Sequence, residues 1–243
     1  MRSKFQGLKN VAVFNWPYYA FSFMWLLACA AFFLFLDSSR FVWQLRVAVG
    51  ASALVTGYFG LASLVATHIV YDRSDLYSLR WLEKLPGPVR IAASVSAGFD
   101  ETADLLRRAI PELSLELYDF FDPAENTEAS IARARKLKTA EAFAFQKGLR
   151  KKYDTIFLIL SAHEMRSPPS QIQFFEQLRA GILPGGQIVM LEHLRNLANF
   201  LAYGPGFFHF HSDKRWRQSI SKAGGVVKMD FAITPFVRLY VIQ

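Results

Sequence analysis

The sequence predicts an α/β domain with a mostly parallel, seven-stranded sheet and helices on both faces, preceded by a two-helix transmembrane hairpin. The hairpin is predicted because residues 18–36 and residues 47–70 contain no charged side chain. The domain is predicted because strand patterns alternate with amphipathic helix patterns from residue 89 onward. The expected boundaries are 1–71 for the membrane anchor, 72–88 for an interfacial linker helix and 89–243 for the domain.

Each uncharged run is long enough for the roughly 20 residues that span a bilayer core. A soluble helix of this length normally shows a polar face, so a pair of buried core helices explains the runs less well. The short link at residues 37–40 makes the two helices antiparallel neighbours. Gly50, Ala53, Gly57 and Gly60 form a stripe of small residues, which we expect to pack against the first helix.

Basic residues stand outside both ends of the hairpin, with Arg2, Lys4 and Lys9 before it and Arg73 and Arg80 after it. By the positive-inside rule, both ends face the cytoplasm. We therefore expect an integral membrane protein with its domain on the cytoplasmic side, as in a bacterial inner membrane.

The chain has a single cysteine, Cys29, which excludes an intramolecular disulfide and a cysteine-rich metal site. Its net charge of +8 is concentrated, within the domain, at residues 133–138, 147–152 and 214–217. Beside a membrane anchor, these basic clusters fit anionic lipid head groups better than nucleic acid. A solvated face is the alternative for at least one of them.

The elements of the domain follow in order along the chain. Strands are predicted at 89–95, 113–120, 140–145, 153–162 and 183–193, with helices at 101–110, 123–137 and 170–182. Asp122 and Pro123 should cap and begin the second helix. A helix at 213–224 precedes closing strands at 225–233 and 237–243, which form a hairpin at one edge. This order gives a Rossmann-like sheet covered on both faces.

The domain resembles class I S-adenosylmethionine-dependent methyltransferases. The order of elements carries the resemblance, together with the Pro-Gly-Gly turn into the fifth strand and "SKAGGVV" before the final hairpin. An apolar strand that ends in "LSAHE" adds to it, and it covers residues 75–243. The resemblance implies S-adenosyl-L-methionine as cofactor and transfer of its methyl group to an acceptor.

The resemblance also implies that the cofactor lies across the turn after the first strand. The family's glycine positions fall on Ser94, Ser96 and Gly98, and small residues there allow close approach of a ligand to the backbone. Asp119, at the end of the second strand, is placed to accept hydrogen bonds from both ribose hydroxyls, or it caps a turn. Adenine contacts are expected in the third-strand region, where Glu141 is a candidate. The predicted cofactor-binding residues are Ser94, Ser96, Ala97, Gly98, Asp119, Ser161 and Ala162.

His163 and Glu164, both predicted as catalytic residues, follow the fourth strand, at the edge where open α/β sheets bind ligands. Glu164 is expected to orient His163 or to bind the acceptor. His163 is a candidate general base toward an acceptor oxygen, because an ordinary histidine titrates near neutrality. Alternatively, it satisfies the loop and packs beneath the cofactor. Glu192 and His193 end the fifth strand and face the same edge, with His193 as a further catalytic candidate. No histidine pair has the i, i+4 spacing of a helical zinc site, so we predict no metal.

Residues 199–216 are dense in Phe and Tyr and are interrupted by Gly-Pro-Gly. We expect this segment to cover an apolar acceptor, to contact membrane lipid or to pack into the core. The predicted acceptor-binding residues are Glu192, Tyr203, Phe207, Phe208 and His209.

The sequence therefore predicts a membrane-anchored methyltransferase that acts on a lipophilic small molecule, either phenolic, quinone-like or lipid. The alternative is a catalytically inactive, methyltransferase-like protein that binds or regulates a membrane partner, which the serines of the first turn favour. The hairpin, and the lack of an Asn/Asp-Pro-Pro-aromatic turn, disfavour a nucleic-acid substrate.

Overall fold

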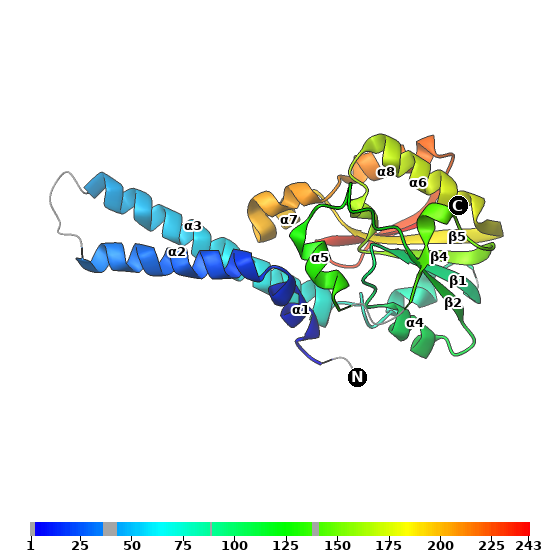
Figure 1. The fold of residues 1–243 in the computed structure, drawn as a ribbon, viewed down its shortest axis with the longest axis horizontal. Coiled ribbons are helices and arrows are strands. Elements are labelled where there is room, and N and C mark those ends of the chain that lie inside the picture. Colours follow the sequence, from blue (N-terminus) through cyan, green and yellow to red (C-terminus); the bar gives the residue numbers. More distant parts are fainter. Residues whose placement is uncertain (1–2, 36–42, 88, 138–140) are drawn as a thin grey trace.

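The computed structural model describes residues 3–35, 43–87, 89–137 and 141–243. A long helical hairpin projects from an α/β domain (Figure 1). The hairpin consists of α2 (Trp16–Phe35) and α3 (Trp43–His68), and α3 continues into a π-helical turn, η2 (Ile69–Arg73). The predicted link at residues 37–40 lies outside the described residues.

Among the described residues, α2 and the helix that begins with α3 are long and apolar enough to cross a membrane, with mean hydropathies of 1.8 and 1.6. Hydroxyl groups lie between them, as where Tyr19 Oη is 3.3 Å from Ser63 Oγ. A Cβ atom at Gly57 or Gly60 would meet no described atom within 4 Å outside its own helix. The predicted packing of the small-residue stripe is therefore wrong at these two glycines, because the helices meet on the hydroxyl-bearing face instead.

A short helix, α1 (Gln6–Phe14), precedes the hairpin and lies beside the domain (Figure 1). Asp72, from the end of the hairpin, holds its first turn. The Asp72 carboxylate accepts hydrogen bonds from the N–H groups of Gly7 at 2.7 Å and Leu8 at 3.1 Å. This contact joins α1, which precedes the hairpin, to the π-helical turn that ends the hairpin.

The linker after the hairpin is less helical than the sequence predicts. Within the described part of residues 72–88, regular helix beyond the π turn is confined to η3 (Arg80–Lys84), a 3₁₀ helix. Leu79 adopts a φ of 57° just before it, which interrupts any longer helix. Trp81, which lies in the linker predicted to be interfacial, is buried against the sheet beside Phe157.

Within the described residues, the domain holds a seven-stranded sheet in the order β3-β2-β1-β4-β5-β7-β6. Strands β1 to β5 pair in parallel, whereas β7 is antiparallel to both β5 and β6. The sheet is therefore mixed rather than mostly parallel, because the closing hairpin places its second strand between β5 and β6. The strands are β1 (Ile91–Ser96), β2 (Ser114–Asp119), β3 (Phe143–Ala144), β4 (Tyr153–Ile159), β5 (Ile182–His193), β6 (Val227–Ala232) and β7 (Val237–Ile242).

Helices lie on both faces of the sheet, above and below the strands in Figure 1. The core on one face includes α6 (Pro168–Ala180) and α8 (Asp213–Lys222), and the core on the other includes α4 (Ala103–Ala109) and the linker. The predicted helix at 123–137 is shorter: α5 (Ala129–Arg135) begins after a turn in which Asp122 accepts a hydrogen bond from the Ala124 N–H at 2.8 Å.

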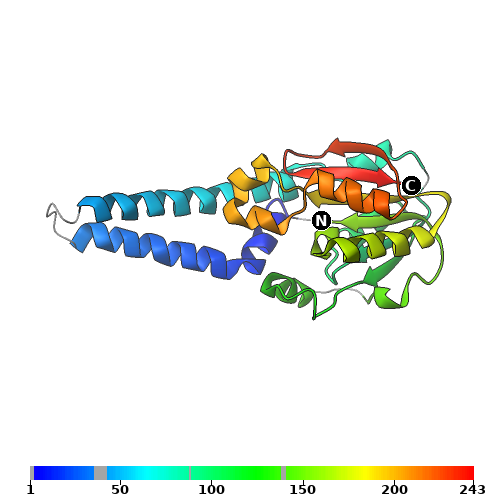
Figure 2. The same ribbon diagram turned by 90° about the horizontal axis from the view of Figure 1, so that it is seen from above.

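The carboxyl edge of the parallel strands faces the hairpin. His193, which ends β5, lies 3.2 Å from Tyr71 Oη at the base of α3. After β1, Phe99 packs edge-on against Phe14 of α1, with ring centroids 5.4 Å apart. After β5, α7 (Leu197–Tyr203) and η6 (Gly204–His209) lie beside α3 (Figure 2). The edge where α/β sheets bind ligands is thus the edge nearest the apolar helices.

Candidate active site at the carboxyl edge of the sheet

The turn after β1 is stabilised by its own polar side chains. Ser94 Oγ donates to Asp100 at 2.5 Å, and the Gly98 N–H donates to Ser96 Oγ at 3.3 Å. Gly98 has a φ of 91°, in the region that favours glycine. The two serines at expected glycine positions therefore hold the turn in shape, while the remaining glycine stands where the backbone requires one.

Arg135, at the end of α5, fills the space between this turn and β2. Strand pairing sets Ser96 opposite Asp119, which brings the predicted ribose ligand to the turn. Arg135 Nη1 donates to Asp119 Oδ2 at 2.9 Å and to the Ala97 carbonyl at 2.8 Å. A Cβ atom at Gly98 would lie 1.7 Å from the same nitrogen. The guanidinium thus lies on the turn and on the carboxylate that the sequence predicts to bind the cofactor.

His163 lies between two carboxylates at the ends of β4 and β5. Its Nδ1 is 2.7 Å from Glu192 Oε2, and its Nε2 is 3.4 Å from Glu164 Oε1. The other oxygen of Glu192 accepts a hydrogen bond from the Ala162 N–H at 2.6 Å. Glu192 was predicted to contact the acceptor, but it is fully buried and faces His163, which it orients.

The two carboxylates control the protonation of His163. Burial alone would lower the pKa of His163, but the charge of Glu192 and the hydrogen bond to Glu164 outweigh it and raise the pKa to about 10. Burial would likewise raise the pKa of Glu164, but its hydrogen bonds to His163 and His209 lower it. At neutral pH the site therefore holds an imidazolium between two carboxylates.

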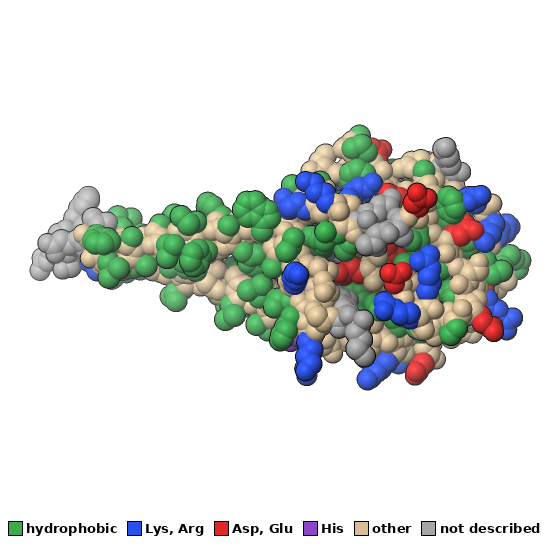
Figure 3. All heavy atoms as spheres, turned by 60° about the horizontal axis from the view of Figure 1, so that its bottom comes forward, with side chains coloured by type: hydrophobic (Ala, Val, Ile, Leu, Met, Phe, Trp, Pro, Cys, Tyr) green, Lys and Arg blue, Asp and Glu red, His purple; other side chains and the backbone are tan. Residues whose placement is uncertain are grey.

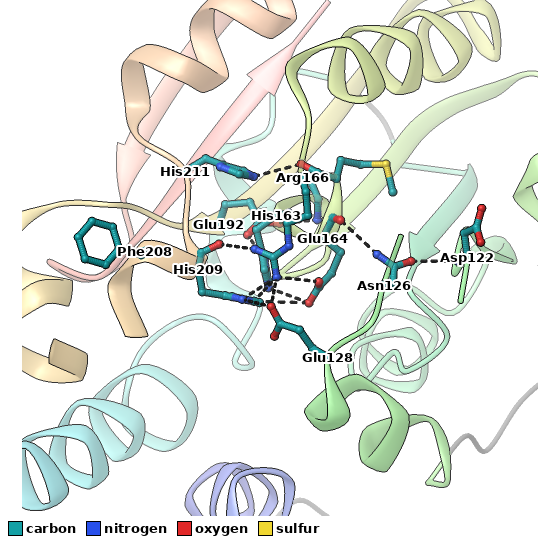
Figure 4. Close-up of polar contacts among 12 residues, drawn as sticks. Asp122, Asn126, Glu128, His163, Glu164, Arg166, Glu192, Phe208, His209 and His211 are labelled. Carbon is teal, nitrogen blue, oxygen red and sulfur yellow. Dashed lines mark hydrogen bonds and ion pairs between the residues drawn. The ribbon is translucent and has the colours of Figure 1, made fainter. Parts of the chain in front are cut away.

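An ion-pair network surrounds Glu164 (Figure 4). Arg166 contacts Glu128, lies 3.3 Å from Glu164 Oε2 and donates to the His209 carbonyl at 2.8 Å. His209 Nδ1 is 2.8 Å from Glu128 Oε1. Burial would raise the pKa of Glu128, but the hydrogen bond and charge of His209, with the charge of Arg166, lower it. The network joins α5, the β4 loop and the aromatic segment.

His163, Glu164 and His209 offer ligand atoms that lie within 4.8 Å of one another, so they could hold a metal ion. Arg166 already places its guanidinium among them, 2.6 Å from His209 Nδ1. A metal ion would have to displace that positive charge. Ion pairing therefore accounts for this cluster better than metal binding.

His193, the second catalytic candidate, lies in an aromatic cluster. Its Nδ1 is 3.2 Å from Asn199 Oδ1, and its ring stacks on Phe210 with centroids 4.7 Å apart. Burial, together with the charge of His163, lowers the pKa of His193 to about 3. A neutral ring with both nitrogens near partners joins β5 to α7 and to Tyr71 of the hairpin.

The structure separates the predicted acceptor-binding residues into two groups. Tyr203 packs edge-on against His193, and His209 belongs to the ion-pair network. Phe208 points away from that network (Figure 4), is 62% exposed and packs on Phe207. The outer side of the segment is therefore an exposed apolar surface beside α3.

Two further predicted cofactor residues lie under the site. Ser161 Oγ donates to the Val95 carbonyl at 2.9 Å, which ties the β4 loop to β1, and Ala162 donates to Glu192. Glu141, the adenine candidate, is exposed just before β3, and residue 140 lies outside the described residues.

Sequence reasoning missed Asn126, Glu128, Arg135 and Arg166 as site residues. Asn126 Nδ2 donates to the Glu164 carbonyl at 3.1 Å, from a stretch predicted as helix. Arg135 belongs to a basic cluster that was assigned to lipid or solvent. The presence of an acid at the end of β2 was the one available signal, since a buried carboxylate requires a partner.

No protein-family model matches the chain, and neither does any curated protein sequence. Solved structures share its fold, each with a TM-score of 0.51. The mitomycin 7-O-methyltransferase MmcR is 15% identical and aligns over 99% of this chain and 73% of its own. The pyocyanin biosynthetic protein PhzM and TnmH are 11% and 19% identical over 79% and 82% of this chain. The chain spans 66% of PhzM and 59% of TnmH, less than two thirds of each.

Proposed function

We propose that the protein is a membrane-anchored, S-adenosylmethionine-dependent methyltransferase whose acceptor is a lipophilic small molecule with a hydroxyl group. One observation carries the proposal: the sheet edge that holds His163 and Glu192 faces the apolar hairpin. The fold shared with a 7-O-methyltransferase supports the same chemistry. A phenolic, quinone-like or lipid acceptor dissolved in the bilayer fits a site at this edge.

The residues at the first turn fit the cofactor if the Arg135 side chain moves. Gly98 leaves a space that any side chain would fill, and the Asp119 carboxylate lies beside it. Asp119 would accept hydrogen bonds from the ribose hydroxyls, and the backbone of the turn would lie along the methionine moiety. When bound, S-adenosylmethionine supplies an activated methyl group, so alignment of the acceptor contributes much of the rate.

His163 is the proposed general base. Only the neutral form of His163, whose share grows as pH rises toward its pKa of about 10, would act as the base: with Nδ1–H on Glu192 and Nε2 unprotonated, it would take the proton of an acceptor hydroxyl that replaces Glu164 at Nε2. Glu192, at Nδ1, would then stabilise the resulting imidazolium and hold the ring in position. Glu164 and the ion-pair network would restore the resting arrangement after the acceptor leaves.

The surface supports a location at the membrane (Figure 3). Hydrophobic side chains line the hairpin, while Lys and Arg side chains gather over the domain. The apolar surface continues onto α7 and η6, where Leu197 is 70% exposed and Gly204 packs against the Phe59 ring of α3. In the proposed orientation both ends of the hairpin and the domain are cytoplasmic, and the acceptor reaches the site from lipid.

A second candidate is an inactive membrane protein with the same fold. The pairing of Arg135 with Asp119 favours it, because this ion pair occupies the proposed cofactor site. The two candidates differ in whether the crevice opens to the cofactor.

The test begins with calorimetric titration of the detergent-solubilised full chain with S-adenosylmethionine and S-adenosylhomocysteine. Transfer of a labelled methyl group is then measured in proteoliposomes that contain lipid-soluble phenols or quinols. Saturable binding and labelling of one of these acceptors would support the enzyme. Absence of binding at millimolar cofactor by folded protein would overturn it in favour of the inactive candidate.

A further inference from the structure

We propose that Arg135 is an internal latch that closes the cofactor site and is released by movement of α5 away from α1. The inference rests on the proposed function, because it takes the turn after β1 as the cofactor site. It assigns to Arg135 a role that neither its sequence context nor the fold suggests.

The contacts of Arg135 match the space and the polar groups that the cofactor requires. Its Nη1 lies 3.0 and 2.9 Å from the two oxygens of Asp119 and 2.8 Å from the Ala97 carbonyl. The guanidinium carbon lies 4.0 Å from the centroid of the Phe121 ring. Hydrogen bonds to both carboxylate oxygens and an aromatic face define one position for this side chain, so the latch is a built contact rather than a loose surface arginine.

Ribose and guanidinium compete for the same acceptor. Two ribose hydroxyls require the oxygens of Asp119 as acceptors, and the space over Gly98 must be empty of side-chain atoms. The cofactor also carries a positive sulfonium, which a nearby guanidinium would repel. Cofactor and latched Arg135 therefore exclude each other. The apparent affinity for the cofactor equals the intrinsic affinity multiplied by the fraction of molecules in which the latch is open.

The position of the latch depends on the helix that leads into the membrane. Arg133, on α5, donates from Nε to the Phe14 carbonyl at the end of α1, at 2.5 Å. The same Phe14 ring packs on Phe99, next to the turn, and Asn10 of α1 contacts Glu101. Thus α1 holds both α5 and the cofactor turn, and it continues directly toward α2. A shift of α1 at the bilayer surface would change how readily the latch opens.

The test compares variants of the full chain in detergent by calorimetric titration with S-adenosylhomocysteine and with adenosine. Arg135→Ala should tighten binding of both ligands, by about tenfold if the latch is open in about one tenth of the unaltered molecules, because the apparent dissociation constant is the intrinsic one divided by the open fraction. Arg135→Gln, which keeps a polar side chain, should shift affinity in the same direction. Arg133→Ala should give a smaller gain, since it frees α5 but leaves the guanidinium in place. Arg108→Ala, which removes an exposed cation from α4, is the control and should bind as the unaltered protein does.

The outcomes separate the latch from the function on which it rests. Equal affinity of Arg135→Ala and the unaltered protein would overturn the latch and leave cofactor binding intact. Weaker binding of S-adenosylhomocysteine with unchanged binding of adenosine would also overturn it, and would make Arg135 a ligand of the cofactor carboxylate. If no folded variant binds either ligand, the proposed function itself is wrong.

Discussion

The carboxylate of Glu192 lies 2.7 Å from Nδ1 of His163, and both side chains are buried at the carboxyl edge of the sheet. Glu192 comes from the end of β5 and His163 from the loop after β4, so the pairing of these two parallel strands sets the contact. In the proposed reaction, the contact fixes which imidazole nitrogen is turned toward the acceptor. It also determines the pH at which that nitrogen can accept a proton.

Replacing Glu192 should shift the pH dependence of methyl transfer. Because His163 has a pKa of about 10, its basic form increases as pH rises toward 10, and kcat/KM should rise with it. Glu192→Gln removes the charge that raises this pKa, so the rise should move toward neutral pH, with a lower maximum. The profile is measured with a phenolic acceptor in proteoliposomes. Glu116→Gln, on β2 where this carboxylate pairs with Lys151, is the control. An unmoved profile for Glu192→Gln would exclude His163 as the base.

The free energy of unfolding should depend on pH through His163 and Glu164. The folded-state pKa of His163 exceeds its ordinary value of 6.5, so its contribution is complete below pH 6.5 and is lost as pH rises to about 10. The pKa of Glu164 is lowered from 4.5, so its contribution is present above that value and is lost in acid. Urea unfolding followed by tryptophan fluorescence should show the alkaline decline, and His163→Gln should flatten it. A decline of equal slope in this variant would assign the effect to other groups.

A side chain at Gly98 should remove cofactor binding and destabilise the turn. Its φ of 91° costs a residue such as valine about 1–3 kcal/mol, and the new Cβ would meet Arg135 at 1.7 Å and Asp119 at 2.9 Å. We expect Gly98→Val to bind no S-adenosylhomocysteine in calorimetry. The double change Gly98→Val with Arg135→Ala should regain only the part of the stability lost to the contact with Arg135, because the strain at φ 91° remains, and it should not regain binding. Recovery of binding in the double variant would place the cofactor elsewhere.

The sequence was sufficient for the elements whose pattern is local and strong. The uncharged runs became α2 and α3, and the apolar run at 153–162 became β4. Strand pairing then brought Ser96 beside Asp119 and His163 beside Glu192, as the parallel order implies. Contacts that depend on where a helix begins were not predictable. Because of the turn at Asp122, α5 begins only at Ala129. The position of this start determines where Arg135, in the last turn of α5, lies.

The ion-pair partners of the basic clusters were likewise not predictable from the sequence. Arg217, in the cluster at 214–217, pairs with Asp213 and with Asp230 of β6. Composition alone favoured a lipid-binding or solvated role for such residues. Asp213 lies one turn before Arg217 in α8, whereas Asp230 lies on another element, so only the fold reveals that Arg217 also pairs across the domain.

Topology can be tested by cysteine labelling in intact cells, with Cys29 replaced by serine. A cysteine in place of Ser38, in the predicted link, should react with an impermeant thiol reagent, whereas one in place of Gln243 should not. The expected pattern follows from the basic residues at both outer ends of the hairpin. Labelling at residue 243 alone would show that the orientation is the reverse of the one expected.

The exposed apolar side of α7 and η6 should matter only when the acceptor is dissolved in lipid. Phe208 and Leu201 are 62% and 47% exposed on the segment that lies beside α3. Transfer of one such side chain from water into an apolar phase is worth about 1.5–3 kcal/mol, so we infer that both contact the bilayer near the acceptor's entrance. The double change Phe208→Ser with Leu201→Ser should leave affinity for S-adenosylhomocysteine within about twofold, because neither residue contacts the turn after β1.

Turnover separates the roles of this surface. In proteoliposomes, the double variant should methylate a long-chain acceptor several-fold more slowly, yet act normally on a short-chain, water-soluble analogue in detergent. Val226→Ser, which removes an exposed apolar side chain beside β6, is the control and should change neither rate. Equal loss on both acceptors would make the segment part of the acceptor site itself. Unfolding of the variant, seen as a lost cooperative thermal transition, would instead assign these residues to the packing of α7 on the hairpin.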